Sequence, residues 1–116
     1  MGDHNDTGSK GEELAVDFLE RQGYKVLSRN FRFRRFEIDI VARRDDWLLF
    51  IEVKTRSNVG YGEPEEFVHA LQSGRILEAA EEYMLSINWQ GHVRFDIISV
   101  VVGAHTEIIH FKDAIN

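Results

Sequence analysis

Hydrophobic residues recur at helical spacing near the N-terminus and again in the second half of the chain. The first set fits one face of a helix over Gly11–Gln22, which Gly23 would end. Its apolar positions are Leu14, Ala15, Phe18 and Leu19. A second, longer helix is predicted over Glu65–Ile87, with buried positions that include Phe67, Leu71, Ala79, Ala80 and Tyr83. The polar, glycine-rich residues 1–10 are expected to form a flexible head.

Alternation of apolar and polar residues predicts strands in the remaining segments. These are Tyr24–Asn30, Phe36–Ala42, Trp47–Thr55, Val93–Val102 and Glu107–Phe111. Aromatic and basic residues alternate over Phe31–Arg35, which suits an exposed turn or hairpin loop, and residues 57–64 contain the only proline and favour a loop. The order helix, three strands, helix, two strands predicts one α/β domain over residues 11–116, with a mixed central sheet flanked by helices.

The second and third predicted strands are separated only by Arg43–Asp46, which predicts an antiparallel hairpin. If the hairpin turns at the centre of its Asp-Asp pair, residues whose numbers sum to 91 face each other. Asp39 then faces Glu52, and Glu37 faces Lys54. Directly opposed Cβ atoms in such a pair lie ~4.5–5.5 Å apart. Two carboxylates are thus expected side by side, with a lysine next to them.

Carboxylates at this separation repel each other unless a cation lies between them. Ligands that are all oxygen atoms suit Mg²⁺ or Mn²⁺ rather than zinc. A lysine beside the ion can orient or help deprotonate a water, or stabilise charge on a phosphate. Asp39, Glu52 and Lys54 therefore form a minimal set for metal-assisted phosphodiester hydrolysis. A surface hairpin with an ion pair between Glu37 and Lys54 explains the same residues.

The charge distribution points to a phosphate-containing partner although the net charge is −6, from 14 basic and 20 acidic residues. Ten of the basic residues and only five acids lie between Arg21 and Arg56, so this window carries a net +5. Phosphate binding responds to a local patch of charge. We expect the arginines that flank the acidic positions to contact a nucleic-acid backbone: Arg29, Arg32, Arg34, Arg35 and Arg56. A solvated arginine-rich face is the alternative. Phe31 and Phe33, between these arginines, would stack on bases or pack in the core.

Composition excludes several classes of protein. With 43% hydrophobic and 29% charged residues, the chain has the balance of a soluble globular domain. Cysteine is absent, so neither disulfides nor a thiolate metal site can form. Because no apolar run approaches the ~20 residues of a membrane helix and the N-terminus lacks an apolar signal segment, a cytoplasmic protein without membrane contact is expected.

A few residues allow more than one interpretation. Glu13 at the start of the first predicted helix suits the helix macrodipole. Glu37 can bind a metal, pair with Lys54 or face solvent. The five histidines show no ligand spacing and are interpreted as unrelated surface or edge residues. Asp96 is interpreted as structural, bonding Arg94 or a backbone group.

Short motifs also occur in a fixed order along nearly the whole chain. They are Gly11-Glu12, Ala15, Leu19, Gly23-Tyr24, Arg29-Asn30, Glu37–Ala42, Phe50–Arg56, Ala80, Tyr83, Arg94–Asp96 and Ile109–Ala114. In order and spacing they resemble the YraN family of uncharacterised bacterial proteins. Members of that family are predicted nucleases of the restriction-endonuclease-like superfamily, whose catalytic pattern is PD-(D/E)xK. The resemblance implies this superfamily's fold and a nuclease activity.

The same superfamily includes archaeal Holliday-junction resolvases, whose active sites use a helix glutamate, an aspartate and a Glu-x-Lys. By position, the resemblance implies that Glu12, Asp39, Glu52 and Lys54 are catalytic. Family members typically carry a lysine where this chain has Gln72, and a lysine at this position could contact phosphate. We expect Gln72 to donate a neutral hydrogen bond to the nucleic acid instead.

We therefore expect a metal-dependent endonuclease that cuts branched or structured DNA, with a role in DNA repair or recombination. Asp39, Glu52 and the Val53 carbonyl would hold Mg²⁺ or Mn²⁺, and Glu12 would bind through water or a second ion. A homodimer would match two-fold symmetric DNA. The rival hypothesis is an accessory protein that binds nucleic acid without cutting it, which would explain Phe36 where the family usually has glycine. A nuclease specific for RNA is the third, because no residue recognisably reads the 2′-hydroxyl.

Overall fold

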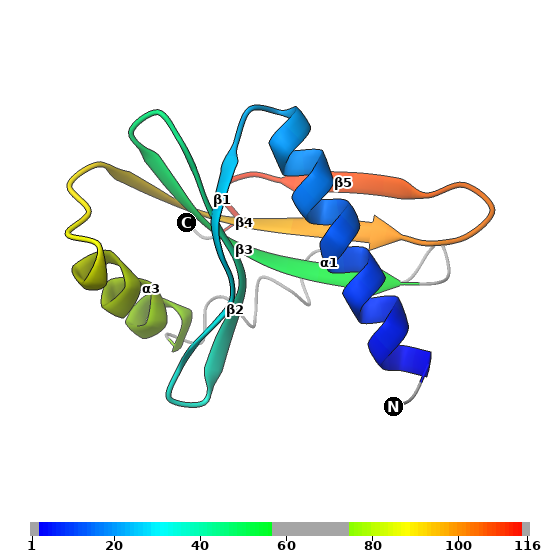
Figure 1. Ribbon diagram of the computed structural model, residues 1–116, viewed down its shortest axis with the longest axis horizontal. Coiled ribbons are helices and arrows are strands. Elements are labelled where there is room, and N and C mark those ends of the chain that lie inside the picture. Colours follow the sequence, from blue (N-terminus) through cyan, green and yellow to red (C-terminus); the bar gives the residue numbers. More distant parts are fainter. Residues whose placement is uncertain (1–2, 57–74, 115–116) are drawn as a thin grey trace.

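The structure, a computed structural model, describes residues 3–56 and 75–114 (Figure 1). Its elements are α1 (Asp3–Arg21), β1 (Lys25–Phe33), β2 (Phe36–Arg44), β3 (Trp47–Arg56), α3 (Arg75–Ser86), β4 (His92–Val101) and β5 (Glu107–Phe111). The sheet order is β1-β2-β3-β4-β5, with β3 and β4 parallel and the other neighbours antiparallel. The predicted α/β fold, a mixed central sheet flanked by helices, is confirmed. Neither described helix is long and apolar enough to cross a membrane.

Two apolar clusters hold the helices against the sheet. α1 lies across the strands of the sheet, while α3 lies beside the hairpin formed by β1 and β2 (Figure 1). The α1 cluster consists of Ala15, Leu19, Tyr24, Ile40, Ala42, Leu49, Ile51, Ile98 and Val100. The α3 cluster consists of Ile38, Val41, Leu48, Phe50, Ile76, Ala79, Ala80, Tyr83 and Ile97. The buried positions predicted for the second helix are therefore confirmed where the structure describes them.

Helix α1 begins earlier than the sequence pattern predicted. It starts at Asp3, so residues 3–10 belong to the helix and not to a flexible head before Gly11. Once the packed turns have nucleated a helix, adding further turns costs little free energy. The predicted stop is confirmed, since Gly23 has a φ of +92° and donates to the Glu20 carbonyl at 3.1 Å. Tyr24 N–H donates to Leu19 O at 3.0 Å, which completes a Schellman cap.

The first hairpin is longer than expected. The predicted loop over Phe31–Arg35 is wrong, because β1 continues to Phe33 and only Arg34 and Arg35 form the turn. Phe31 and Phe33 pack against the α3 cluster, so burial of their rings extends the strand. Of the long predicted helix, residues 65–74, including Phe67, Leu71 and Gln72, lie outside the described residues, as does the predicted loop 57–64.

The register of the β2–β3 hairpin follows the prediction from its turn. The paired residues run from Arg44 opposite Trp47 to Ile40 opposite Ile51, all summing to 91. Beyond Ile40 the β2–β3 pairing ends, while β2 stays paired with β1 and β3 stays paired with β4. We call the space between β2 residues 36–39 and β3 residues 52–56 the fork.

The fork changes which residues share a face of β2. Ile38 packs in the α3 cluster and Ile40 in the α1 cluster, although regular alternation along a strand would place both on one face. The β2–β3 pairing ends at Ile40 opposite Ile51, before the predicted cross-strand pairs of Asp39 with Glu52 and of Glu37 with Lys54. Asp39 and Glu52 occupy the first positions after the last paired residues.

Candidate metal site at the fork

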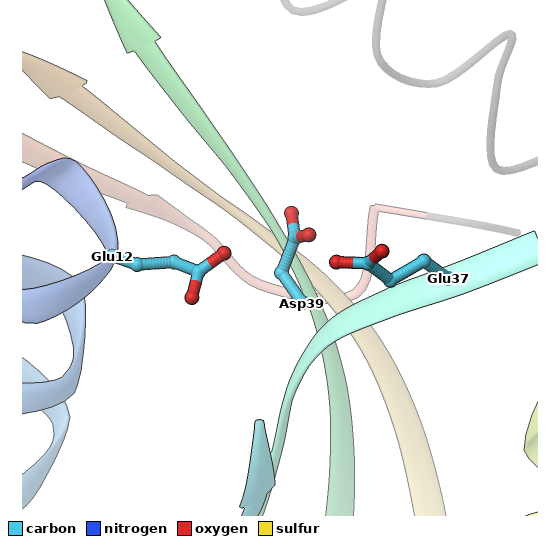
Figure 2. A group of neighbouring side chains, drawn as sticks. All are labelled: Glu12, Glu37 and Asp39. Atoms are coloured by element: carbon cyan, nitrogen blue, oxygen red, sulfur yellow. The ribbon is translucent and has the colours of Figure 1, made fainter. Parts of the chain in front are cut away.

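Three carboxylates from two elements converge at the fork. Glu12 comes from α1, and Glu37 and Asp39 come from β2. One oxygen of each lies within 4.8 Å of the others, and all three residues are half-buried. Figure 2 shows the Asp39 carboxylate between those of Glu12 and Glu37. We refer to these three residues as the acidic cluster.

The close approach of α1 to β3 places Glu12 in the acidic cluster. Gly11 is buried, and a Cβ atom at this position would overlap the side chain of Thr55. Only glycine therefore lets the helix lie this close to the strand. Because Glu12 follows Gly11 directly, its carboxylate is carried to the fork.

Asn30 connects two members of the acidic cluster. Its Nδ2 donates to Glu12 Oε2 at 3.0 Å and to Glu37 Oε2 at 2.8 Å. The residue has a φ of +55°, in the left-handed region that asparagine adopts more readily than most residues. In the sequence analysis Asn30 was named only within the Arg29-Asn30 motif and was given no role. The signal that could have identified it is an asparagine in a segment that otherwise alternates apolar and polar residues.

Asp39 is held by the backbone of β3. Val53 N–H donates to Asp39 Oδ2 at 2.8 Å, just beyond the last paired residues of β2 and β3. Burial raises the pKa of Asp39 to about 6, against the lowering effect of this hydrogen bond. The charges of Glu12 and Glu37 raise this pKa further, and that of Lys54 lowers it.

Glu52 lies within electrostatic reach of the acidic cluster without being one of its three converging members. Burial, and then the charge of Asp39, raise the pKa of Glu52 to about 8, while Lys54 lowers it. Burial is the main cause of both raised pKa values, and repulsion between the carboxylates adds to it; a bound cation would favour the charged form of each acid. The roles predicted for Glu52, Lys54 and the Val53 carbonyl stay predictions.

Two of the predicted phosphate-binding arginines are paired with the acids of the site. Arg29 donates to Glu13 at 3.1 Å and to Glu12 at 3.4 Å, and Arg32 lies 3.2 Å from Glu37. Because α1 begins at Asp3, Glu13 does not lie at a helix N-terminus, and the macrodipole explanation for it is wrong.

The other predicted contacts lie further from the acidic cluster. Arg34 and Arg35 form the tip of the β1–β2 hairpin, where the Arg34 guanidinium lies 5.1 Å from the centre of the Phe33 ring. Arg56 ends β3 and is half-buried. Gln72 lies outside the described residues.

A second polar network lies around the buried Asp96. Its carboxylate accepts from Arg94 at 2.9 Å and from Asp113 N–H at 2.9 Å, and lies 2.7 Å from His110 Nε2. Arg94 also donates to the Tyr24 hydroxyl at 3.2 Å. The structural interpretation of Asp96 is confirmed. His110, interpreted from the sequence as an unrelated surface or edge residue, does lie on the edge strand β5, but its side chain is 7% exposed and belongs to this network.

Comparisons with known proteins match nearly the full chain. The sequence model described as "Uncharacterised protein family UPF0102" matches residues 11–100. A UPF0102 protein of Flavobacterium psychrophilum is 41% identical over 115 residues, which is 98% of this chain and 97% of that protein. One from Bacteroides thetaiotaomicron is 43% identical over 115 residues, covering 98% and 95%. One from Cytophaga hutchinsonii is 44% identical over 98 residues, covering 84% and 87%. These names state no activity, so the nuclease superfamily stays a prediction.

Proposed function

The chain belongs to the uncharacterised protein family UPF0102, and we propose from its site that it is a metal-dependent endonuclease that hydrolyses phosphodiester bonds in branched or structured DNA. The observation that carries this proposal is the convergence of Glu12, Glu37 and Asp39 at the fork. The order of sequence motifs, which resembles that of nucleases with a Glu-x-Lys pattern, supports it.

The donor set at the fork fits a hard divalent cation. Its members offer only carboxylate oxygens, which Mg²⁺ and Mn²⁺ prefer. We propose that Asp39 binds the ion together with Glu12 and Glu37, and that Glu52 completes the set. When bound, such an ion neutralises charge on a phosphate and increases the acidity of a water.

Lys54 is the basic member of the proposed site. It lies two residues beyond Glu52 on β3 and is exposed, so a substrate can reach it. Its charge lowers the pKa of both Asp39 and Glu52. We propose that Lys54 donates a hydrogen bond that orients the attacking water and stabilises charge on the phosphate oxygens.

A second candidate function is supported by the pairing of the acids. Arg29, Arg32 and Asn30 donate to Glu12 and Glu37. Donors of the protein thus already satisfy part of the negative charge. An accessory protein that binds nucleic acid without cutting would keep this arrangement in place of a cation.

The test is a cleavage assay with end-labelled four-way junction, flap, single-stranded and linear duplex DNA, and with RNA versions of each. Every substrate is incubated with Mg²⁺, Mn²⁺ or EDTA. We expect metal-dependent cutting of the branched DNA that is lost in Asp39→Asn and Lys54→Ala. Glu12→Gln and Glu13→Gln form a matched pair on one helix, and only the first removes a member of the acidic cluster.

The outcomes separate the hypotheses. Loss in Glu12→Gln with cutting retained in Glu13→Gln supports the acidic cluster as the site. Cutting that survives both Asp39→Asn and Lys54→Ala contradicts the assignment. Binding without cutting under every metal condition supports the accessory protein. Cutting restricted to RNA supports the hypothesis of an RNA-specific nuclease.

A further inference from the structure

An open, basic cleft lies at the turn between β2 and β3, at the end of these strands away from the fork. Its volume is about 370 Å³. It is lined by Gly23, Lys25, Leu27, Arg43, Arg44 and Asp45. We call it the Arg43 cleft. Three of its side chains are cationic and one is acidic, so the cleft carries net positive charge.

Arg43 is held in position by neutral groups. Its Nε donates to the backbone oxygen of Asp45 at 2.9 Å, and its guanidinium lies 5.0 Å from the centre of the Trp89 ring. These contacts fix the side chain and leave its charge uncompensated.

Arg44 is held in the same way on the other side of β2. It donates to the backbone oxygen of Gln22 at 2.8 Å, and its guanidinium lies 4.2 Å from the centre of the Tyr24 ring. Lys25 is exposed and lies opposite Arg43 in the β1–β2 register. Within residues 3–56 and 75–114, neither guanidinium forms an ion pair with a carboxylate.

This pattern differs from that of the arginines at the fork. Arg29 and Arg32 contact carboxylates at 3.1–3.4 Å and 3.2 Å, so part of their charge is already neutralised. An incoming phosphate gains more from cations that no carboxylate neutralises. Part of the charge of the basic window, at Lys25, Arg43 and Arg44, is therefore available away from the acidic cluster.

The separation of the two sites suits one nucleic-acid strand. Arg43 follows Asp39 by four residues on β2, which corresponds to about 13 Å along a strand. Successive nucleotides of duplex DNA advance by about 3.4 Å along the helix axis. One backbone can therefore contact both positions a few nucleotides apart.

We propose that the Arg43 cleft binds a backbone phosphate of the DNA a few nucleotides from the bond positioned at the fork. Lys25 and Arg43 supply the charge, and Arg44 forms the opposite wall. This inference rests on the proposed function for its substrate, but it concerns binding and not the chemical step.

The experiment measures binding of a fluorescein-labelled four-way DNA junction by anisotropy, in EDTA and from 50 to 200 mM salt. Lys25→Gln and Arg43→Gln are each expected to weaken binding about eightfold at 0.1 M salt and to lower the slope of log K against log salt by about one. Arg43→Lys retains the charge and is expected to retain the slope. Inorganic phosphate, added as a competitor, distinguishes a site for free phosphate from one for the DNA backbone.

Arg21→Gln is the matched control. It removes the same charge close to the cleft, but the Arg21 guanidinium lies 3.0 Å from Asp17 in an ion pair. We expect its salt slope to equal that of the unmodified protein. An equal loss in Arg21→Gln, or an unchanged slope in both Lys25→Gln and Arg43→Gln, overturns the proposal. Displacement of the junction by millimolar phosphate at constant ionic strength also overturns it, because the cleft is then a site for free phosphate.

Repeating the measurement in the Asp39→Asn protein separates this inference from the nuclease proposal. Binding by Asp39→Asn that depends on Lys25 supports the cleft whether or not the unmodified protein cuts DNA, and absence of cutting by the unmodified protein under every metal condition contradicts the nuclease alone. Metal-dependent cutting with a salt slope unaffected by Lys25→Gln contradicts the cleft alone. Lys25 is exposed, so its substitution keeps the test independent of any change that Arg43→Gln causes in folding.

Discussion

Substitution of Glu52 by glutamine should stabilise the metal-free protein near neutral pH. The pKa of Glu52 rises from 4.5 to about 8 on folding, chiefly because burial disfavours its charged form. The unfolded chain therefore ionises this group at a lower pH than the folded protein does. The resulting destabilisation is absent at low pH, grows as the pH rises from about 4.5 to about 8, and is constant above that range.

The size of this effect follows from the two pKa values. At pH 7 the difference corresponds to about 3 kcal/mol of lost unfolding free energy, since each pKa unit is worth about 1.4 kcal/mol. Part of this belongs to Asp39, because the two carboxylates repel each other. Glutamine has nearly the same shape and carries no charge. Glu52→Gln should thus be up to about 3 kcal/mol more stable, or about 10 °C in Tm.

Urea denaturation in EDTA, followed by the fluorescence of Trp47 and Trp89, measures the difference. The comparison of variant with unmodified protein is made at pH 4 and pH 7, so that other titrating groups cancel. We expect no difference at pH 4 and a clear gain at pH 7. Equal or lower stability of the variant at pH 7 would show that the fork does not hold a desolvated carboxylate at this position. In a separate comparison without EDTA, added Mg²⁺ should stabilise the unmodified protein more than Glu52→Gln.

Three further outcomes follow from the contacts around the fork and the buried network. Gly11→Ala should cost about 1–3 kcal/mol of unfolding free energy because its Cβ overlaps Thr55, and Thr55→Gly should restore part of the loss in a double-mutant cycle. Asn30→Gly and Asn30→Ala both remove the two hydrogen bonds of the side chain, but only alanine is also strained in the left-handed backbone conformation. Thermal denaturation should therefore rank the alanine variant below the glycine variant in Tm. Asp96→Asn should cost about 3–5 kcal/mol near neutral pH, because it removes the buried charge that pairs with Arg94. Burial raises the pKa of Asp96, but hydrogen bonds with His110 and then with Arg94 hold this pKa below the usual 3.8. The stabilisation by Asp96 is therefore present above pH 3.8 and is lost as the pH falls through the pKa of the folded protein. An acid titration of stability with the same midpoint in Asp96→Asn and in the unmodified protein would contradict this.

Local patterns predicted most of the fold. Alternation located the strands within a few residues, and the short Asp-Asp turn predicted the β2–β3 register because an antiparallel hairpin has one pairing for a given turn. The end of that pairing was not predictable. No local pattern marks it, because β1–β2 pairing and β3–β4 pairing both continue past it. The β2–β3 ladder ends at Ile40 opposite Ile51, before the expected cross-strand pair of Glu37 with Lys54.

The candidate site was predicted in part for the same reason. Spacing placed Asp39 near β3, and the resemblance pointed to Glu12, but neither showed that Glu37 completes the cluster. That depends on the left-handed conformation of Asn30, which is a tertiary property. Arg29 was also expected to contact phosphate. Composition does not show that its charge is already partly neutralised by an acid of the protein.

The position of the acidic cluster depends on how the β1–β2 hairpin is held beside the fork. Beyond Ile40, the β1–β2 hairpin that carries Glu37 and Asp39 has no ladder pairing with β3, and the hydrogen bond from Val53 N–H to Asp39 Oδ2 joins the two strands there. The hairpin also packs against α3, where the ring of Phe31 on β1 meets Tyr83 edge-on with ring centres 5.1 Å apart. The position of Glu37 and Asp39 relative to Glu12 of α1 thus depends in part on packing against a helix that carries none of the three carboxylates.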